Sequence, residues 1–232
     1  MSATITATDG SGSFDAFVVK PPGGGPHGAV VLIQEIFGVN ESMRETARQV
    51  AAMGFVVLVP DLFWRQRAGV DLTDRTEAEW KEAFALMHAF DQDKGIEDLK
   101  ATVAAARGMP GCNGRVGTMG YCLGGRLAMM MAMRSNADVN ISYYGVGLDS
   151  LLDGLDRIQA PLLLHIADQD DQFPAAGRAK VVAASHGHEH ARACVYPNAG
   201  HAFARVAGTH WQARAATIAN GRSAEALAAA LG

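Results

Sequence analysis

A cysteine between two glycines, in the stretch Gly-Tyr-Cys-Leu-Gly at residues 120–124, is the segment of this sequence best suited to chemistry. The stretch has the Gly-x-Ser-x-Gly form of a nucleophile elbow, with Cys122 in place of the serine. Glycines permit the sharp strand-to-helix turn that exposes such a side chain, and the N-terminus of the following helix favours a thiolate. The sequence therefore predicts a cysteine nucleophile. A buried structural cysteine is the alternative for a thiol among apolar residues.

Three other reactive side chains each follow an apolar, strand-like segment: Glu35, Asp170 and His201. With Cys122 they supply a nucleophile, an acid, a base and one further carboxylate. The chain order of nucleophile, acid and histidine is that of the triad in α/β-hydrolases. In such a triad His201 would move protons between the nucleophile and the leaving group, while Asp170 would orient its ring. A histidine in a surface loop is the alternative for His201.

The elements that must position these residues follow a regular alternation. Residues 4–24 indicate two short strands around a Gly-rich turn, and the Pro/Gly stretch that ends this segment stops the pairing. Apolar segments that predict strands then alternate with stretches that predict helices, near 43–53, 77–90, 94–107, 123 onward, 175–184 and up to 231. This alternation predicts an α/β fold: a mostly parallel central sheet with helices on both faces, an N-terminal hairpin, and chemistry at the carboxyl ends of the strands.

Composition narrows the class of protein. The chain has 232 residues, 49% of them hydrophobic and 19% charged, with a formal charge of −4. These values predict one globular domain over residues 1–232 and do not suit a disordered or a nucleic-acid-binding protein. There is no signal-like N-terminus and no apolar run of about 20 residues, so we expect a cytoplasmic protein without membrane contact. The three cysteines do not suggest a disulfide framework, and Cys112 and Cys194 are predicted to be structural.

Seven motifs together resemble the dienelactone hydrolase family. They are QEIFGVN (34–40), MRET (43–46), PDLFWRQ (60–66), AFDQDKGIEDL (89–99), GYCLGG (120–125), YYGVGL (143–148) and AGHAFAR (199–205). The resemblance spans nearly the whole chain, and the pairing of the first motif with GYCLGG is specific. It implies an α/β-hydrolase fold without a lid domain and a cysteine hydrolase that needs no cofactor and no metal. The implied substrate is a carboxylated unsaturated lactone.

The resemblance also implies which carboxylates act. Family members usually carry the triad acid four residues before a proline, which here is Pro174 and selects Asp170, with Asp171 as the alternative. The glutamate of QEIFGVN contacts the cysteine in the family, which pairs Glu35 with Cys122. The alternative for Glu35 is a buried ion pair with an arginine, either Arg205 or Arg44.

Further site residues follow from the same resemblance. The N–H groups of Ile36 and Leu123 are expected to form the oxyanion hole, and Arg205 is expected to bind the substrate carboxylate. The other expected substrate contacts are Tyr143, Phe84 and Phe37. The sequence departs from the family where a second arginine is expected, because Arg75 is out of register, and Phe84 and Met87 stand where tyrosine and tryptophan are frequent.

Several other features are given structural interpretations. The stretch HGHEH (186–190) could hold a metal, but a solvated loop is the preferred interpretation because no distant ligand is evident. The Met-rich run 127–133 is expected to be a buried helix rather than a binding surface. His165, inside an apolar strand, is expected to be a hydrogen-bonded core residue.

Three functions remain open at this point. The first is a hydrolase that opens a small carboxylated lactone or ester, such as a dienelactone, through Cys122, His201 and Asp170. The second is a broader carboxylesterase or thioesterase with the same triad. The third is a non-catalytic protein in which Cys122 senses oxidants, although such a sensor would not need a triad. The expected partner is a small-molecule substrate, and the chain is expected to be a monomer or a weak homo-oligomer.

Overall fold

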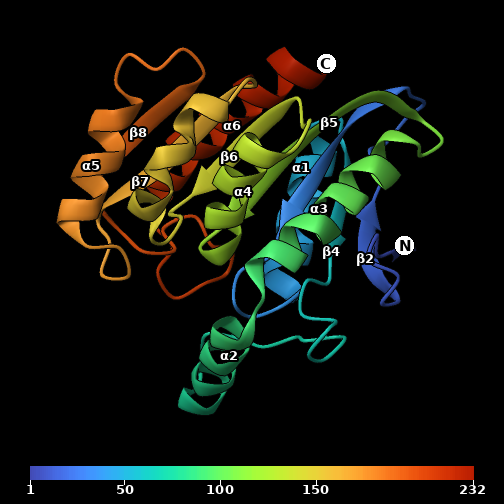
Figure 1. Cartoon of the computed structure of the whole chain (residues 1–232), viewed down its shortest axis with the longest axis horizontal. Coiled ribbons are helices and arrows are strands. Elements are labelled where there is room, and N and C mark those ends of the chain that lie inside the picture. Colours follow the sequence, from blue (N-terminus) through green and yellow to red (C-terminus); the bar gives the residue numbers. More distant parts are fainter.

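The core of the molecule is one eight-stranded sheet with the order β1-β2-β4-β3-β5-β6-β7-β8, seen in a computed structural model that describes residues 1–232 (Figure 1). The strands are β1 (Ser2–Thr6), β2 (Ser13–Val19), β3 (His27–Ile33), β4 (Val56–Pro60), β5 (Cys112–Tyr121), β6 (Val139–Tyr143), β7 (Leu162–Gln169) and β8 (Ala191–Gly200). β1 pairs antiparallel with β2, and β2 pairs antiparallel with β4. All the other pairings are parallel. The predicted opening hairpin and the mostly parallel sheet are confirmed.

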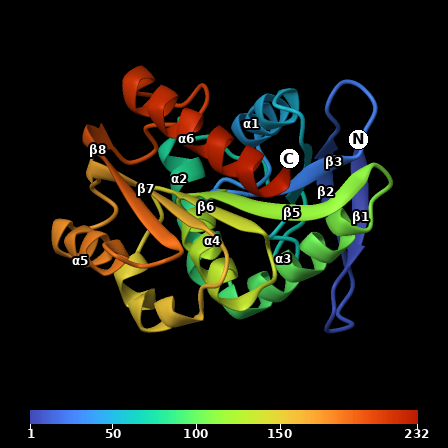
Figure 2. The same cartoon turned by 90° about the horizontal axis from the view of Figure 1, so that it is seen from above.

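Helices cover both faces of the sheet, as the alternation of elements predicts. They are α1 (Glu41–Ala52), α2 (Glu77–Ala89), α3 (Gln92–Arg107), α4 (Leu123–Arg134), α5 (Ala175–Ser185) and α6 (Ala213–Leu231). α1 and α6 lie on one face, and α3, α4 and α5 lie on the other (Figure 2). The starts of α1, α2 and α3 are fixed by side chains that accept a backbone N–H bond, from Asn40, Thr76 and Asp91.

One element is absent from the sequence-based prediction. The 3₁₀ helix η1 (Leu148–Arg157) lies between β6 and β7 and packs its leucines into a small second core cluster. Its leucines at 148, 151, 152 and 155 have helical spacing, which is a signal for it. Aspartates and a glycine alternate with them, and these residues favour turns, so the segment gives no clear helical pattern.

The centre of the sheet is fully enclosed. Residues 29–33 of β3 are completely buried, as expected of a parallel strand with helices on both faces. In α4, Met129 and Met131 are also completely buried, which confirms the interpretation of the Met-rich run as a core helix. None of the helices is both long enough and apolar enough to span a lipid bilayer.

Candidate active site

Cys122 occupies a strained turn between β5 and α4. Its backbone has φ 55° and ψ −114°, a region that residues with a Cβ rarely adopt, and its N–H donates to the carbonyl of Tyr143 at 3.0 Å. A Cβ at Gly124 would lie 2.4 Å from the carbonyl oxygen of Ile33, and one at Gly120 would lie 2.0 Å from the carbonyl oxygen of Gly124. Both glycines are therefore required by close backbone packing. The turn places Cys122 at the N-terminus of α4, as a nucleophile elbow does.

His201 and Asp170 meet beside this turn. Nδ1 of His201 lies 3.0 and 2.9 Å from the two carboxylate oxygens of Asp170. The N–H of Gln172 donates to Asp170 at 2.8 Å and fixes the carboxylate. The side chains of His201 and Asp170 are 9% and 1% exposed, whereas Asp171 is exposed and makes no hydrogen bond with the ring. Of the two candidates for the acid, Asp170 is the one at the histidine.

The charge state of His201 follows from these neighbours. Burial lowers the pKa of His201, but the negative charge of the Cys122 sulfur and the bond to Asp170 outweigh burial and raise this pKa to about 10. The ring is thus poised to hold a proton at neutral pH between a sulfur and a carboxylate.

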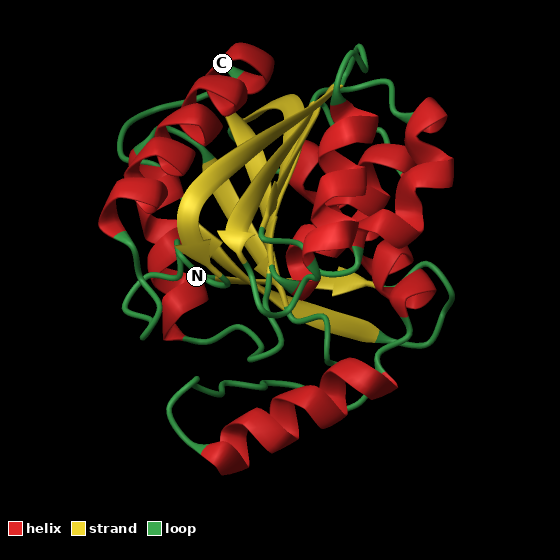
Figure 3. Ribbon diagram, turned by 90° about the vertical axis from the view of Figure 1, so that its left-hand side faces the viewer, coloured by secondary structure: helices red, strands yellow, loops and turns green.

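Cys122 and His201 share one pocket, with a volume of about 90 Å³. This is several times the space that one water molecule requires, so the pocket suits a small substrate. It is lined by Ile36, Trp80, Phe84, Met87, Cys122, Val146, Gln172, His201 and Arg205. Three of these residues come from α2, which lies apart from the other helices (Figure 3). The wall is mostly apolar, and Arg205 is the one arginine or lysine in it.

Arg205 is buried and surrounded by acceptors. Its Nε and Nη2 donate to the two carboxylate oxygens of Glu35 at 2.6 and 3.2 Å, and its Nη1 donates to Asp74 at 2.7 Å. The guanidinium also lies over the ring of Phe37, with 5.0 Å from its central carbon to the ring centroid. Burial lowers the pKa of Arg205, but Glu35 reverses this and raises it above the ordinary value. Arg205 therefore stays charged.

The structure decides between the two arginines considered for Glu35. Arg205 holds Glu35, whereas Arg44 pairs with Glu41 and Asp71. No hydrogen bond joins Glu35 to Cys122, so the contact implied by the family resemblance is not made in this structure.

Two of the predicted substrate contacts, Phe37 and Tyr143, do not line the pocket that holds Cys122 and His201. Phe37 packs edge-on against Trp80, with 4.9 Å between ring centroids, and thus supports the pocket wall from behind. The hydroxyl of Tyr143 lies 2.9 Å from Asn220 and 2.7 Å from Ser223, both on α6. Phe84, Ile36 and Arg205 do line the pocket.

Leu123, one of the two expected oxyanion-hole donors, is the first residue of α4, so its N–H has no partner within the helix.

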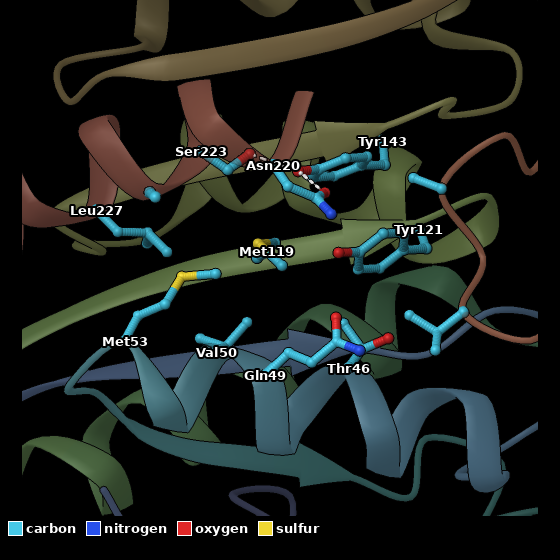
Figure 4. A pocket seen from close by; sticks show the side chains of 13 residues that line it. Thr46, Gln49, Val50, Met53, Met119, Tyr121, Tyr143, Asn220, Ser223 and Leu227 are labelled. Atoms are coloured by element: carbon cyan, nitrogen blue, oxygen red, sulfur yellow. Dashed lines mark hydrogen bonds between the residues drawn. The ribbon is translucent and has the colours of Figure 1, made fainter. Parts of the chain in front are cut away.

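Tyr143 borders a different cavity, between α1 and α6 (Figure 4). Its volume is about 20 Å³, which is enough for about one water molecule, and it contains no acid, base or thiol that could react. The neighbouring residue, Tyr144, faces the catalytic side instead. Its ring centroid lies 5.2 Å from that of His201, and its backbone has a positive φ of 38°.

Sequence reasoning missed four residues of the site, two of them apolar and two polar. Trp80 precedes Phe84 by four residues, so helical spacing places both on one face of α2 and was a usable signal. Val146 and Asp74 lie in loops, where no periodic pattern indicates which way a side chain points. Gln172 lies two residues after Asp170, and its backbone N–H donates a hydrogen bond to the carboxylate of Asp170.

The two remaining histidine predictions can be compared with the structure. His165 is fully buried between the hydroxyls of Tyr196 and Ser223, at 2.7 and 2.9 Å, which confirms it as a core residue. Burial lowers its pKa to about 3, so the ring stays neutral. In the HGHEH stretch, Nδ1 of His188 accepts backbone N–H bonds from His190 and Ala191. His188 therefore orders its own loop.

Comparisons with known proteins identify the family of the chain. The profile of the dienelactone hydrolase family matches residues 14–231. A putative carboxymethylenebutenolidase of Azospirillum brasilense is 48% identical over 231 residues, which is 95% of this chain and 95% of that protein. A carboxymethylenebutenolidase of Pseudomonas putida is 38% identical over 211 residues, covering 91% of this chain and 89% of that protein.

A solved structure shares the fold. A putative dienelactone hydrolase from Klebsiella pneumoniae subsp. pneumoniae MGH 78578 superposes with a TM-score of 0.84 at 24% identity, covering 98% of both chains. The predicted α/β-hydrolase fold is confirmed. With a profile match over most of its length, relatives well above 30% identity and a cysteine elbow beside an Asp-His pair, the chain belongs to the dienelactone hydrolase family.

Proposed function

We propose that this protein hydrolyses the ester bond of small lactones and esters with Cys122 as nucleophile, His201 as base and Asp170 as the residue that orients the base. The observation that carries this proposal is the position of the buried Asp170–His201 pair beside a cysteine on a helix N-terminus, with the cysteine and the histidine in one small pocket. Relatives named carboxymethylenebutenolidase support a lactone as the substrate.

The reaction follows from the geometry. His201 holds the thiol proton while the sulfur of Cys122 attacks the carbonyl carbon, and the N–H groups of Ile36 and Leu123 stabilise the oxyanion. His201 then gives its proton to the departing oxygen, which leaves a thioester on Cys122. In a lactone the departing oxygen stays attached to the acyl chain, so this step opens the ring. Water, activated by His201, hydrolyses the thioester and restores the thiol.

We assign Glu35 an indirect role in this scheme. It lies directly before Ile36, whose N–H is aimed at the oxyanion, and its ion pair with Arg205 fixes the end of β3 in place. Its proposed contribution is to hold this strand end in place.

A substrate panel without added metal tests the proposal. Dienelactones, aryl esters and acyl thioesters are assayed with the wild type, with Cys122→Ala and with Cys112→Ala as a control far from the pocket. Cys122→Ala is expected to lose activity by at least about a thousandfold, because the covalent path is removed. Cys112→Ala is expected to match the wild type. Full activity in Cys122→Ala would contradict the proposal, and rapid oxidation of Cys122 without any turnover would favour a sensor.

A further inference from the structure

Arg178 lies on α5, the helix beside β7 and β8 (Figure 1), and its guanidinium binds the loop that carries the triad acid. Its Nη1 donates to the carbonyl of Asp170 at 2.7 Å and to the carbonyl of Phe173, and its Nη2 donates to the carbonyl of Asp168 at 2.6 Å. Arginine carries a planar fork of N–H donors that suits carboxylates, yet all three of these bonds go to backbone carbonyls. The side chain therefore fixes the course of the backbone through residues 168–173.

Two of these carbonyls have no other donor. No backbone N–H donates to the carbonyl of Asp170 or to that of Phe173, and Arg178 is the one side chain that does so. Both residues are buried, with exposed fractions of 5% and 2%. A buried carbonyl without a donor costs free energy comparable to a lost hydrogen bond. Without the guanidinium the loop would have to change its course until both carbonyls found other donors.

The course of this loop sets the geometry of the triad. Beyond a shift of register in the β7–β8 ladder, Gln169 pairs with Gly200, so the residues that follow them, Asp170 and His201, come to lie side by side. The N–H of Gln172 then donates to the carboxylate of Asp170 at 2.8 Å. A loop that changed its course would move this carboxylate relative to Nδ1 of His201, which now lies 2.9 Å away.

We infer that Arg178 is a positioning residue of the triad, which holds the loop of residues 168–173 so that the carboxylate of Asp170 keeps its hydrogen bond to His201. Arg178 does not line the pocket, so it acts through Asp170 and not on the substrate. The inference rests on the proposed ester hydrolysis and deepens it by naming a residue that this triad requires. A displacement of a reacting group by about 1 Å can lower a rate by about 10²-fold, so release of the loop is expected to lower kcat by about 10- to 100-fold.

The test compares Arg178→Met with Lys180→Met in the hydrolysis of 4-nitrophenyl acetate. Lys180 is the matched control because it lies on the same helix, is exposed and loses the same charge, but holds no carbonyl of the loop. Arg178→Met is expected to lower kcat by about 10- to 100-fold while KM stays within about threefold, and Lys180→Met is expected to match the wild type. Hydrogen exchange at the N–H of Gln172 should be faster in Arg178→Met alone, because the released loop opens more often.

A double variant separates positioning of Asp170 from a general loss of structure. Asp170→Asn retains a residual rate above that of water, and adding Arg178→Met to it is expected to lower kcat by less than about twofold, because the contact through which Arg178 acts is already impaired. Wild-type kcat in Arg178→Met, or a further loss of about tenfold or more in the double variant, overturns the inference while ester hydrolysis stands. Wild-type activity in Cys122→Ala would instead overturn the proposed function and this inference with it.

Arg178→Lys decides the matter if Arg178→Met does not fold. An ammonium lacks the planar fork and cannot reach all three carbonyls with the same geometry, so kcat is expected to fall by about three- to tenfold in the wild-type background. In the Asp170→Asn background the same change should have no further effect, and an equal loss in both backgrounds would overturn the inference.

Discussion

Replacing Arg205 by methionine would leave two buried carboxylates without their cation. The side chains of Glu35 and Asp74 are 2% and 7% exposed, so neither gains much hydration when the guanidinium is removed. Removing one partner of a buried ion pair destabilises a protein by about 3–5 kcal/mol. For a chain of this size each kcal/mol lowers Tm by about 2–4 °C, so the expected loss is about 6–20 °C.

The pH dependence distinguishes this explanation from a simple loss of packing. In the wild type, burial raises the pKa of Asp74, but Arg205 outweighs burial and lowers this pKa below its ordinary value. A lowered carboxyl pKa contributes stability that is present at neutral pH and is lost as pH falls through the folded-state value. In Arg205→Met the carboxyl of Asp74 loses the cation that lowers its pKa, so it takes up a proton more readily as pH falls, which relieves the penalty. The difference in unfolding free energy between the two proteins is therefore expected to shrink from about pH 7 to about pH 4.

Urea unfolding followed by circular dichroism at several pH values measures this difference. Arg44→Met is the control, because Arg44 pairs with Glu41 and Asp71 at a more exposed site, and its replacement should cost about 1 kcal/mol or less. Equal losses in the two variants, or a loss in Arg205→Met that does not change with pH, would refute the electrostatic argument.

Two further predictions concern the triad and its turn. Asp170→Asn should lower kcat by about 10⁴-fold through loss of the correct ring orientation of His201, whereas the exposed Asp171→Asn should change kcat less than about twofold. Both effects are measured as kcat for an aryl ester. A larger loss in Asp171→Asn than in Asp170→Asn would show that Asp170 is not the acid. Gly124→Ala should lower Tm and slow alkylation of Cys122, because its Cβ would meet backbone carbonyls at 2.4 and 2.6 Å. Gly221→Ala in α6, where a Cβ meets nothing within 4 Å, should instead keep or raise Tm, and equal Tm values for the two variants would refute this packing argument.

Local patterns were sufficient to predict the fold and the strand ends at which Cys122 and His201 lie, whereas the family resemblance selected Asp170 over Asp171. Cys122, Asp170 and His201 each follow a strand of the parallel part of the sheet, so the sheet brings them to the same edge. The predicted helices near 43–53 and 94–107 begin two residues later than α1 and α3, whose starts are marked by the capping residues Asn40 and Asp91.

Side-chain directions outside regular elements could not be obtained in the same way. Asp74 and Arg205 are separated by 131 positions in the sequence, and no spacing indicates that they meet. Tyr143 and Tyr144 are adjacent, and adjacent residues at the end of a strand point to opposite sides of the sheet. A prediction that names one tyrosine in place of its neighbour therefore places the ring on the opposite face. The structure sends Tyr143 toward α6 and Tyr144 toward His201.

The apolar residues of α2 have a spacing that predicts a helix, but that spacing does not indicate that they line a pocket. Trp80, Phe84 and Met87 have the spacing of a helix face that packs into a core, yet Ala83 is the only buried residue of α2. The three larger side chains are partly buried against the main core and also line the pocket that holds Cys122 and His201, on a helix that lies apart from the other helices (Figure 3). Because the triad is held by strand ends and the apolar wall by α2, substitutions on α2 can change which acyl groups fit without disturbing the groups that react.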